Sequence, residues 1–139
     1  MALILLVLLA ACDPAAPPAS ATVAVEATPE NKAELLLDVE HLVGQAAAMH
    51  AGGRKDDALH DWERAYGIWQ RHLSGTLRAT DATGALELEY TFGQLRQEVV
   101  QNRGRPKPVA ARLEQMLEAR KAALLATVPA PPAPSAAAQ

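Results

Sequence analysis

The stretch DDALHDWERAYGIWQRHL (residues 56–73) decides the fold of this 139-residue chain. Its aromatic and small apolar side chains recur at alternating spacings of four and three, at Ala58, Trp62, Ala65, Trp69 and His72, with Leu59, Tyr66 and Leu73 beside them. That spacing places them on one face of an α-helix. The first turn holds Asp56 and Asp57, which suit the positive end of the helix dipole. We therefore predict an amphipathic helix that bends near Ser74-Gly75 and ends around Thr80.

An equivalent pattern precedes this helix. Thr28-Pro29-Glu30 combines a capping hydroxyl, a proline at the first helical position and an acid in the first turn, which is typical of a helix start. Gly52-Gly53 provides the stop. Between them, the predicted inward residues are Leu35, Val39, Leu42, Ala46 and Met49, flanked by Leu36 and Val43.

Two more patterns follow. Asp81 can cap a third helix that ends at Gly104, with Ala85, Leu88, Phe92, Leu95 and Val99 facing inward. Pro108 can open a fourth helix that ends at Pro129, with Val109, Leu113, Met116 and then Ala123 or Leu124 facing inward. Strict alternation places Arg120 on this inward face, so either its stem reaches the edge of the bundle or Ala119 takes the inward place.

Four such helices joined by short turns predict an all-α fold, an antiparallel up-down four-helix bundle over residues 31–128. Residues 12–30 and 129–139 are rich in Ala and Pro, have no apolar periodicity and are predicted to be a disordered tether and a disordered tail. The domain itself carries 13 basic and 13 acidic residues, so its net charge is zero. A neutral domain has no global field to attract nucleic acid, and we expect no nucleic-acid partner.

Residues 1–11 are predicted to form a signal peptide. Its apolar block ALILLVLLAA (2–11) is too short to cross a hydrocarbon core of ~30 Å. No Lys or Arg precedes this block, which leaves open a start codon upstream of Met1.

The block ends in Leu9-Ala10-Ala11-Cys12, which contains the only cysteine and resembles the bacterial lipobox. The resemblance implies that the Cys12 thiol is lipidated and that the chain is then cut before it. Several acyl chains on one residue, palmitate among them, would anchor the mature protein stably to a membrane. The alternatives are an ordinary signal peptide with an incidental cysteine, or a short buried helix. Asp13 resembles the inner-membrane retention signal of enteric bacteria.

Two family resemblances concern the helices. The segment GRKDDALHDWERAY (53–66) resembles the second half of a tetratricopeptide repeat, but no second copy follows. Residues 58–96 resemble the extracytoplasmic helical region of bacterial high-affinity iron permeases, through Ala65-Tyr66, Trp69, Leu77-Arg78-Ala79, Asp81, Leu88-Glu89, Phe92 and Leu95-Arg96. That family is suspected of handling metal with acids after the Ala-Tyr pair. Here Arg71 and Ser74 occupy those positions, and Glu89 is the one matching acid retained.

Spacing alone also suggests metal ligands. Asp38 with His41, and Asp57 with His60, are Asp-x-x-His pairs of the kind that di-iron bundles build from Glu-x-x-His. Both histidines fall away from the apolar stripes, so we expect them at the surface rather than in a buried dinuclear site. A weak, exchangeable surface site for iron or zinc would use Glu34, Asp38 and His41, and the family resemblance adds Glu89.

The remaining candidates point to packing. His72 with Met49 or Met116 could ligate haem, but no C-x-x-C-H attachment site exists and methionines at such positions usually fill the core. Trp62, Tyr66 and Trp69 form a ridge that we expect to pack inward. We find no pattern of a catalytic triad or phosphate loop and expect no enzyme and no bound cofactor.

The sequence therefore predicts a lipid-anchored protein of the bacterial cell envelope, facing the periplasm or the exterior. Its helical domain would act as a non-catalytic binding or accessory module for an envelope protein. The alternatives are a metal-handling accessory of iron uptake, and self-association through residual apolar surface.

Overall fold

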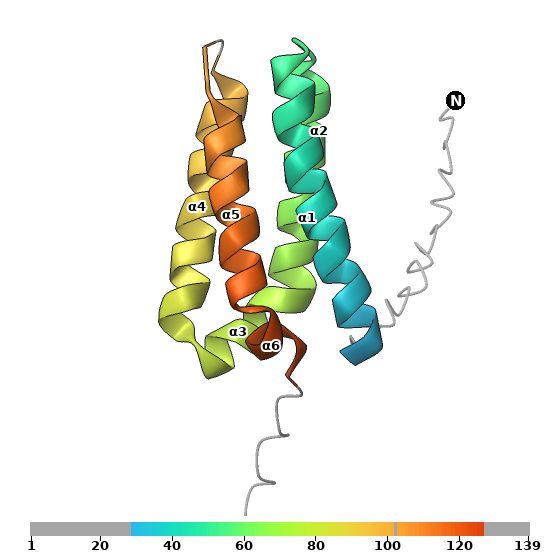
Figure 1. The fold of residues 1–139 in the computed structure, drawn as a ribbon, viewed down its shortest axis with the longest axis vertical. Coiled ribbons are helices and arrows are strands. Elements are labelled where there is room, and N and C mark those ends of the chain that lie inside the picture. The colour runs from blue at the N-terminus through green and yellow to red at the C-terminus, as the bar shows by residue number, and fades with distance from the viewer. Residues whose placement is uncertain (1–28, 102, 127–139) are drawn as a thin grey trace, which may run out of the picture.

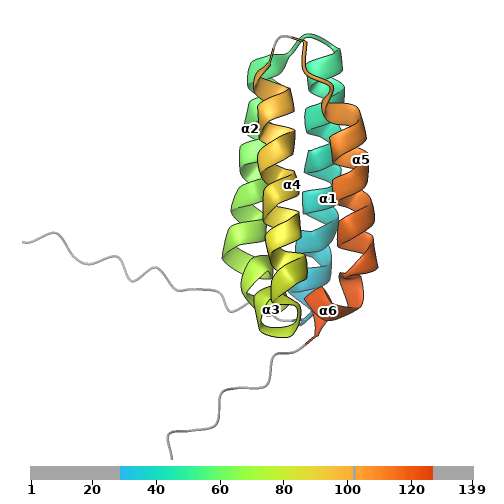
Figure 2. The same cartoon turned by 90° about the vertical axis from the view of Figure 1, so that its left-hand side faces the viewer.

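The longest helices lie side by side, and the chain reverses direction from one of them to the next (Figures 1 and 2). The computed structural model describes residues 29–101 and 103–126, which are all-α, without a strand among them, and this confirms the predicted class. The elements are α1 (Pro29–Ala51), α2 (Lys55–Ile68), the π-helix η1 (Trp69–Leu73), α3 (Ser74–Thr80), α4 (Ala82–Val100), α5 (Pro106–Ala119) and α6 (Lys121–Leu125). Each long helix packs against two others: α1 on α2 and α5, and α4 on α2 and α5.

The first helix begins and ends where the sequence predicts. Gly53 has a φ of 77°, and its N–H donates to the carbonyl of His50, while the Arg54 N–H donates to that of Met49. This is the Schellman arrangement, in which a glycine in the left-handed conformation satisfies the last free carbonyls of a helix. The inward face is shifted slightly, because Leu36 is buried and Leu35 is only half-buried.

The second helix departs from the prediction at η1. The Ser74 N–H donates to the Trp69 carbonyl, five residues back, so this turn holds more residues than an α-helical turn. The wider turn places Leu73 and Leu77 in the core, whereas His72, predicted to face inward, is only half-buried. The predicted bend at Ser74-Gly75 falls where η1 ends and α3 begins. The predicted end at Thr80 is confirmed.

The loop after α4 begins earlier than predicted. The helix is capped by Asp81, whose Oδ1 accepts the Gly84 N–H at 2.8 Å, but it ends at Val100 rather than at Gly104. Gly104 instead lies against the last turn of α4, where a Cβ would come within 1.8 Å of the Glu98 carbonyl oxygen.

The fourth predicted helix begins earlier and is divided in two. It begins at Pro106 rather than Pro108, because a proline needs no N–H acceptor anywhere in the first turn. At Arg120, with φ −106° and ψ 5°, α5 gives way to α6. Arg120 reaches Asp81 at 3.3 Å and Glu87 at 2.6 Å at the edge of the bundle. Ala119 is exposed, so the alternative that it faces inward is wrong.

The core contains the predicted aromatic ridge. Trp62 Nε1 donates to the Phe92 carbonyl at 2.9 Å, and Trp69 is fully buried and stacked on Phe92 with ring centroids 5.9 Å apart. Trp62 and Tyr66 stack at 5.1 Å. The prediction that these rings pack against the core is confirmed.

The predictions for the signal peptide, for Cys12, for Thr28 as a cap and for the tail with Pro129 as a terminator lie outside the described residues. Of the predicted tether (12–30), only Pro29 and Glu30 are described, and both belong to α1 instead. Within residues 29–101 and 103–126, no helix combines the length and the apolar character needed to span a bilayer.

Candidate functional site

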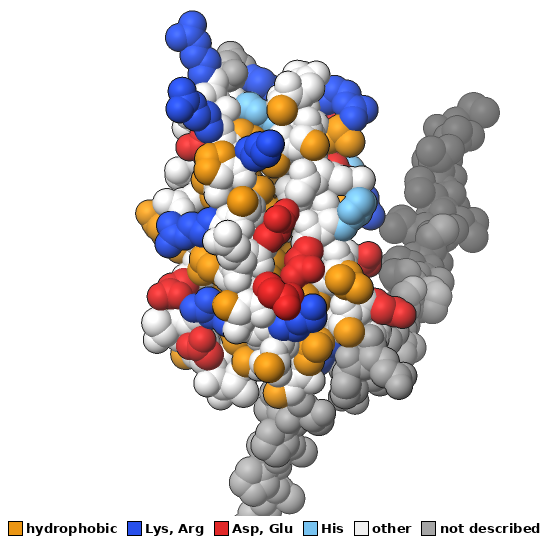
Figure 3. All heavy atoms as spheres, in the orientation of Figure 1, with side chains coloured by type: hydrophobic (Ala, Val, Ile, Leu, Met, Phe, Trp, Pro, Cys, Tyr) orange, Lys and Arg blue, Asp and Glu red, His pale blue; other side chains and the backbone are white. Residues whose placement is uncertain are grey.

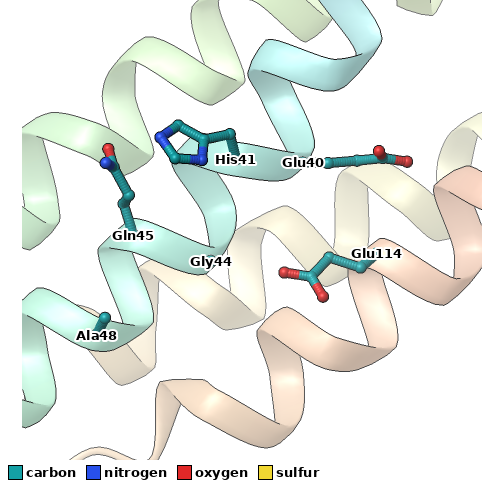
Figure 4. Close-up of a pocket in the computed structure, with 6 residues that line it drawn as sticks. All are labelled: Glu40, His41, Gly44, Gln45, Ala48 and Glu114. Carbon is teal, nitrogen blue, oxygen red and sulfur yellow. The ribbon is translucent and has the colours of Figure 1, made fainter.

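A surface groove runs between α1 and α5, and we call it the α1–α5 groove (Figure 4). It consists of three adjoining hollows of about 420, 330 and 180 Å³ that open to solvent. Its lining residues are Glu40, His41, Gly44, Ala47, Ala48 and Glu114, with Gln45, Lys107, Ala110, Ala111, Gln115 and Glu118. Both walls of the groove are therefore regular helices.

Small residues make the groove. Ala47 and Ala110 are buried in its floor, and Gly44 lies opposite the Glu114 carboxylate. A Cβ on Gly44 would come within 3.2 Å of Glu114 Oε1, so the missing side chain provides the room for that carboxylate. The floor is apolar, and the polar groups stand along its edges.

Carboxylates gather at one end of the groove. Glu40 from α1 and Glu114 and Glu118 from α5 form an acidic patch on the face that the two helices share (Figure 3). Partial burial raises the pKa of Glu40, and the neighbouring Glu118 and Glu114 raise it further, against the opposing effect of Lys121. The Lys121 ammonium lies 3.0 Å from Glu118, and this hydrogen bond raises the pKa of Lys121. Three carboxylates beside one ammonium give this end of the groove a negative charge.

The predicted metal ligands are only partly brought together. Glu34, Asp38 and His41 are all exposed on α1, as expected for a surface position. Of the three, only His41 lines the groove, and its ring projects from the opposite side of α1 from Glu40 (Figure 4). His60, too, is exposed as predicted.

Glu89 lies apart from these residues. It belongs to α4, and its carboxylate accepts a hydrogen bond from the Arg78 guanidinium of α3. In the part of the chain that the structure describes, no group of three or more His, Cys, Asp or Glu side chains is placed to hold a metal ion.

The haem candidates have other contacts. The Met49 sulfur accepts a hydrogen bond from the Arg54 guanidinium, and the Met116 sulfur lies 3.5 Å from the Thr91 hydroxyl. His72 is half-buried in η1.

Sequence reasoning missed the acidic patch. The i, i+4 spacing of Glu114 and Glu118 indicates that they share one face of α5. Nothing in the sequence indicates that Glu40, about 74 residues away, stands beside them. That proximity depends on how α1 and α5 pack, which helical periodicity does not reveal.

Comparison with protein-family models finds no match to this chain, and comparisons with curated proteins and with solved structures find none either.

Proposed function

We propose that this protein is a membrane-anchored bacterial lipoprotein whose helical domain acts as a non-catalytic binding or accessory module in the cell envelope. The observation that carries the proposal is the placement of Leu9-Ala10-Ala11-Cys12 at the end of an uncharged apolar block. The proposed chain is a signal peptide (1–11), a lipidated tether (12–30), a domain (31–128) and a tail (129–139). We class the domain as an antiparallel up-down four-helix bundle, closed at one end by α3 and α6.

The position of the chain ends supports this arrangement. The start of α1 and the end of α6 lie at the same end of the domain (Figure 1), and the two helices contact each other. A tether attached to α1 would leave from this end. A tether of the length of residues 12–28 would reach at most roughly 50 Å if fully extended, which would allow the long faces of the helices to lie clear of a bilayer.

We propose that the α1–α5 groove is the face that meets the partner, and that the partner presents a cationic amphipathic helix. An apolar floor bordered by Glu40, Glu114 and Glu118 suits such a segment, because apolar side chains can lie on the floor while basic groups reach the carboxylates.

The lipid anchor is tested by expressing the full chain in a bacterial host with labelled palmitate. We expect label on the wild-type chain and recovery of the chain with membranes after a high-salt wash. Cys12→Ser should remove the label, because no other cysteine exists to carry it. Equal labelling of both chains, or neither chain in the membrane fraction, would contradict the proposal.

The groove is tested separately with a synthetic amphipathic Leu-Lys helix as the probe. Glu114→Lys should weaken binding to the full chain at least threefold, because it reverses a charge at the groove. The control is Glu34→Lys, which makes the same change at an exposed site of α1 outside the groove. Equal weakening by both variants would show that the probe responds only to net charge.

The alternative function is a metal-handling accessory of iron uptake, which rests on the family resemblance and on Glu34, Asp38, His41 and Glu89. It predicts that stoichiometric iron or zinc remains on the purified full chain after desalting, and that His41→Ala and Glu89→Ala lower the metal content. A chain that binds no metal, or variants that bind as the wild type does, would leave the accessory module as the better account.

A further inference from the structure

The outer face of α4 carries an uncharged stripe of exposed residues. Ala82, Leu86, Tyr90, Gly93, Gln97 and Val100 follow one another at spacings of four, four, three, four and three, and all six are exposed. We call these six residues the α4 stripe. Leu86, Tyr90 and Val100 are 64%, 66% and 53% exposed, and they are three of the four large hydrophobic side chains that the described residues expose.

The α4 stripe faces away from the core. The opposite face of α4 provides the core residues, among them Leu88, Phe92 and Leu95, and the stripe points away from them. The fourth exposed side chain, Leu37 on α1, differs because Glu34, Asp38 and His41 surround it on the same helix. An uncharged stripe that carries exposed large apolar side chains along one face of a whole helix is typical of a helix that packs against another helix.

We propose that the α4 stripe is the interface of a homodimer in which two α4 helices pack antiparallel across a two-fold axis at Gly93. A two-fold interface requires one patch that is complementary to itself. Leu86 lies seven residues before Gly93 and Val100 seven after it, so the antiparallel alignment sets Leu86 of each copy against Val100 of the other. At the centre, a Cβ on Gly93 would meet nothing within 4 Å, so the glycine leaves space for a second helix to approach closely.

The charges beside the stripe support the same alignment. Glu89 and Arg96 lie on one flank, four residues before Gly93 and three after it. Glu89 of each copy, which already accepts a hydrogen bond from Arg78, would face Arg96 of the other. This opposite-charge pair forms twice by symmetry. Glu87 and Glu98 carry like charges, but they lie roughly 100° or more around the helix from the centre of the stripe. Glu87 pairs with Arg120, and Glu98 accepts a hydrogen bond from the Arg105 N–H.

The size of the stripe indicates a weak dimer. Its three large side chains expose on the order of 300 Å² per copy, so two stripes bury about 600 Å² before the flanks are counted. Stable complexes bury about 1,200–2,000 Å². Confinement to a membrane raises the effective concentration of such a pair, and this step rests on the proposed lipid anchor.

The test is disulfide cross-linking of the full chain in membranes of the bacterial host. Gly93→Cys places two thiols at the proposed axis, and oxidation should give at least ten times more covalent dimer than Leu37→Cys on α1. Leu86→Cys tests the direction. In the antiparallel dimer its two copies lie roughly 21 Å apart along the helix axis, beyond the ~4.4–6.8 Å between Cα atoms that a disulfide allows. Adding Tyr90→Glu to Gly93→Cys should lower the dimer yield at least threefold.

Equal yields from Gly93→Cys and Leu37→Cys would overturn the dimer, as would a yield that Tyr90→Glu leaves unchanged. Equal yields from Gly93→Cys and Leu86→Cys would overturn the antiparallel alignment. Cross-linking of the wild-type chain tests the lipid anchor separately from the dimer, because the thiol of Cys12 is the only thiol of that chain. If the wild type itself cross-links, the lipid proposal fails, and the same comparison made with Cys12→Ser still decides the dimer.

Discussion

Gly104 shows how one residue can fix the connection between two helices. Its backbone lies against the last turn of α4, where a Cβ would come within 1.8 Å of the Glu98 carbonyl oxygen. A backbone atom cannot move aside as a side chain can, so Gly104→Ala must displace the loop. We expect a loss of about 2–3 kcal/mol in the free energy of unfolding, measured in urea.

The matched control is Gly75→Ala in α3. Gly75 is exposed, and an added Cβ would meet nothing within 4 Å. Alanine favours the helix, so this variant should gain about 0.5–1 kcal/mol. If the two substitutions have the same effect, the loop does not approach α4 as described.

Lys32 is a buried ammonium held by neutral acceptors. Its Nζ donates to Thr76 Oγ1 at 2.9 Å and lies 3.5 Å from the Ala126 carbonyl oxygen, which joins α1 to α3 and to the end of the domain. Thr76→Val removes the main acceptor but leaves the charge, so it should cost about 1.5–3 kcal/mol of unfolding free energy. Lys32→Met removes the charge as well and should cost less than about 1 kcal/mol. Urea denaturation that gives the opposite order would contradict this assignment.

At the scale of elements, η1 predicts where the chain tolerates a deletion. A π turn contains one residue more than an α turn, so removing exposed Arg71 from η1 should return the helix to α geometry and keep its inward face. Removing exposed Arg64 from α2 instead rotates the following residues by about 100°.

We therefore expect the Arg71 deletion to fold cooperatively, with a loss below about 2 kcal/mol, and the Arg64 deletion to lose its cooperative transition. Circular dichroism during thermal unfolding measures both. Equal damage from the two deletions would argue against a π turn at residues 69–73.

Glu40, at the contact between α1 and α5, makes the stability of the fold depend on pH. Burial, Glu118 and Glu114 raise the pKa of this carboxyl in the folded chain, so the folded state keeps the proton to a higher pH than the unfolded state does. Stability is consequently lost as the pH rises from the ordinary carboxyl pKa through the raised one.

Glu40→Gln should then increase the free energy of unfolding by roughly 0.3–0.5 kcal/mol at pH 7, and by nothing measurable near pH 3, below both pKa values. Urea midpoints at the two pH values measure this effect. Glu34→Gln, which removes an exposed charge from the same helix, is the control. A Glu40→Gln chain that is less stable than wild type at pH 7 would show that the carboxylate is favoured, not penalised, in the fold.

The elements also show what periodicity can and cannot predict. The apolar stripe from Ala58 to Trp69 predicts the helix and its buried face, because burial requires that spacing. The stripe does not show whether His72 or Leu73 is the next inward residue, because the same sequence is compatible with an α turn and with a π turn. The start of α5 is ambiguous for a similar reason, because both Pro106 and Pro108 are compatible with a first turn.

At the scale of the whole molecule, the sequence predicts the helical class but not the surfaces between helices. Glu40 and Glu114 meet because of the packing register of α1 and α5, and Gly44 provides the room. Periodicity within single helices carries no information about that register. The α4 stripe differs from the α1–α5 groove because all its residues belong to one helix. Their spacing is visible in the sequence, and only their exposure required the structure.

The central claim concerns the chemistry of Cys12, since the anchor determines where the helical domain acts. Mass spectrometry of the N-terminal peptide from the full chain, expressed in a bacterial host, tests the claim most directly. Our account predicts a mature chain that begins at Cys12 and carries acyl chains on that residue. A peptide that retains residues 2–11 and an unmodified Cys12 thiol, isolated from the soluble fraction, would contradict it.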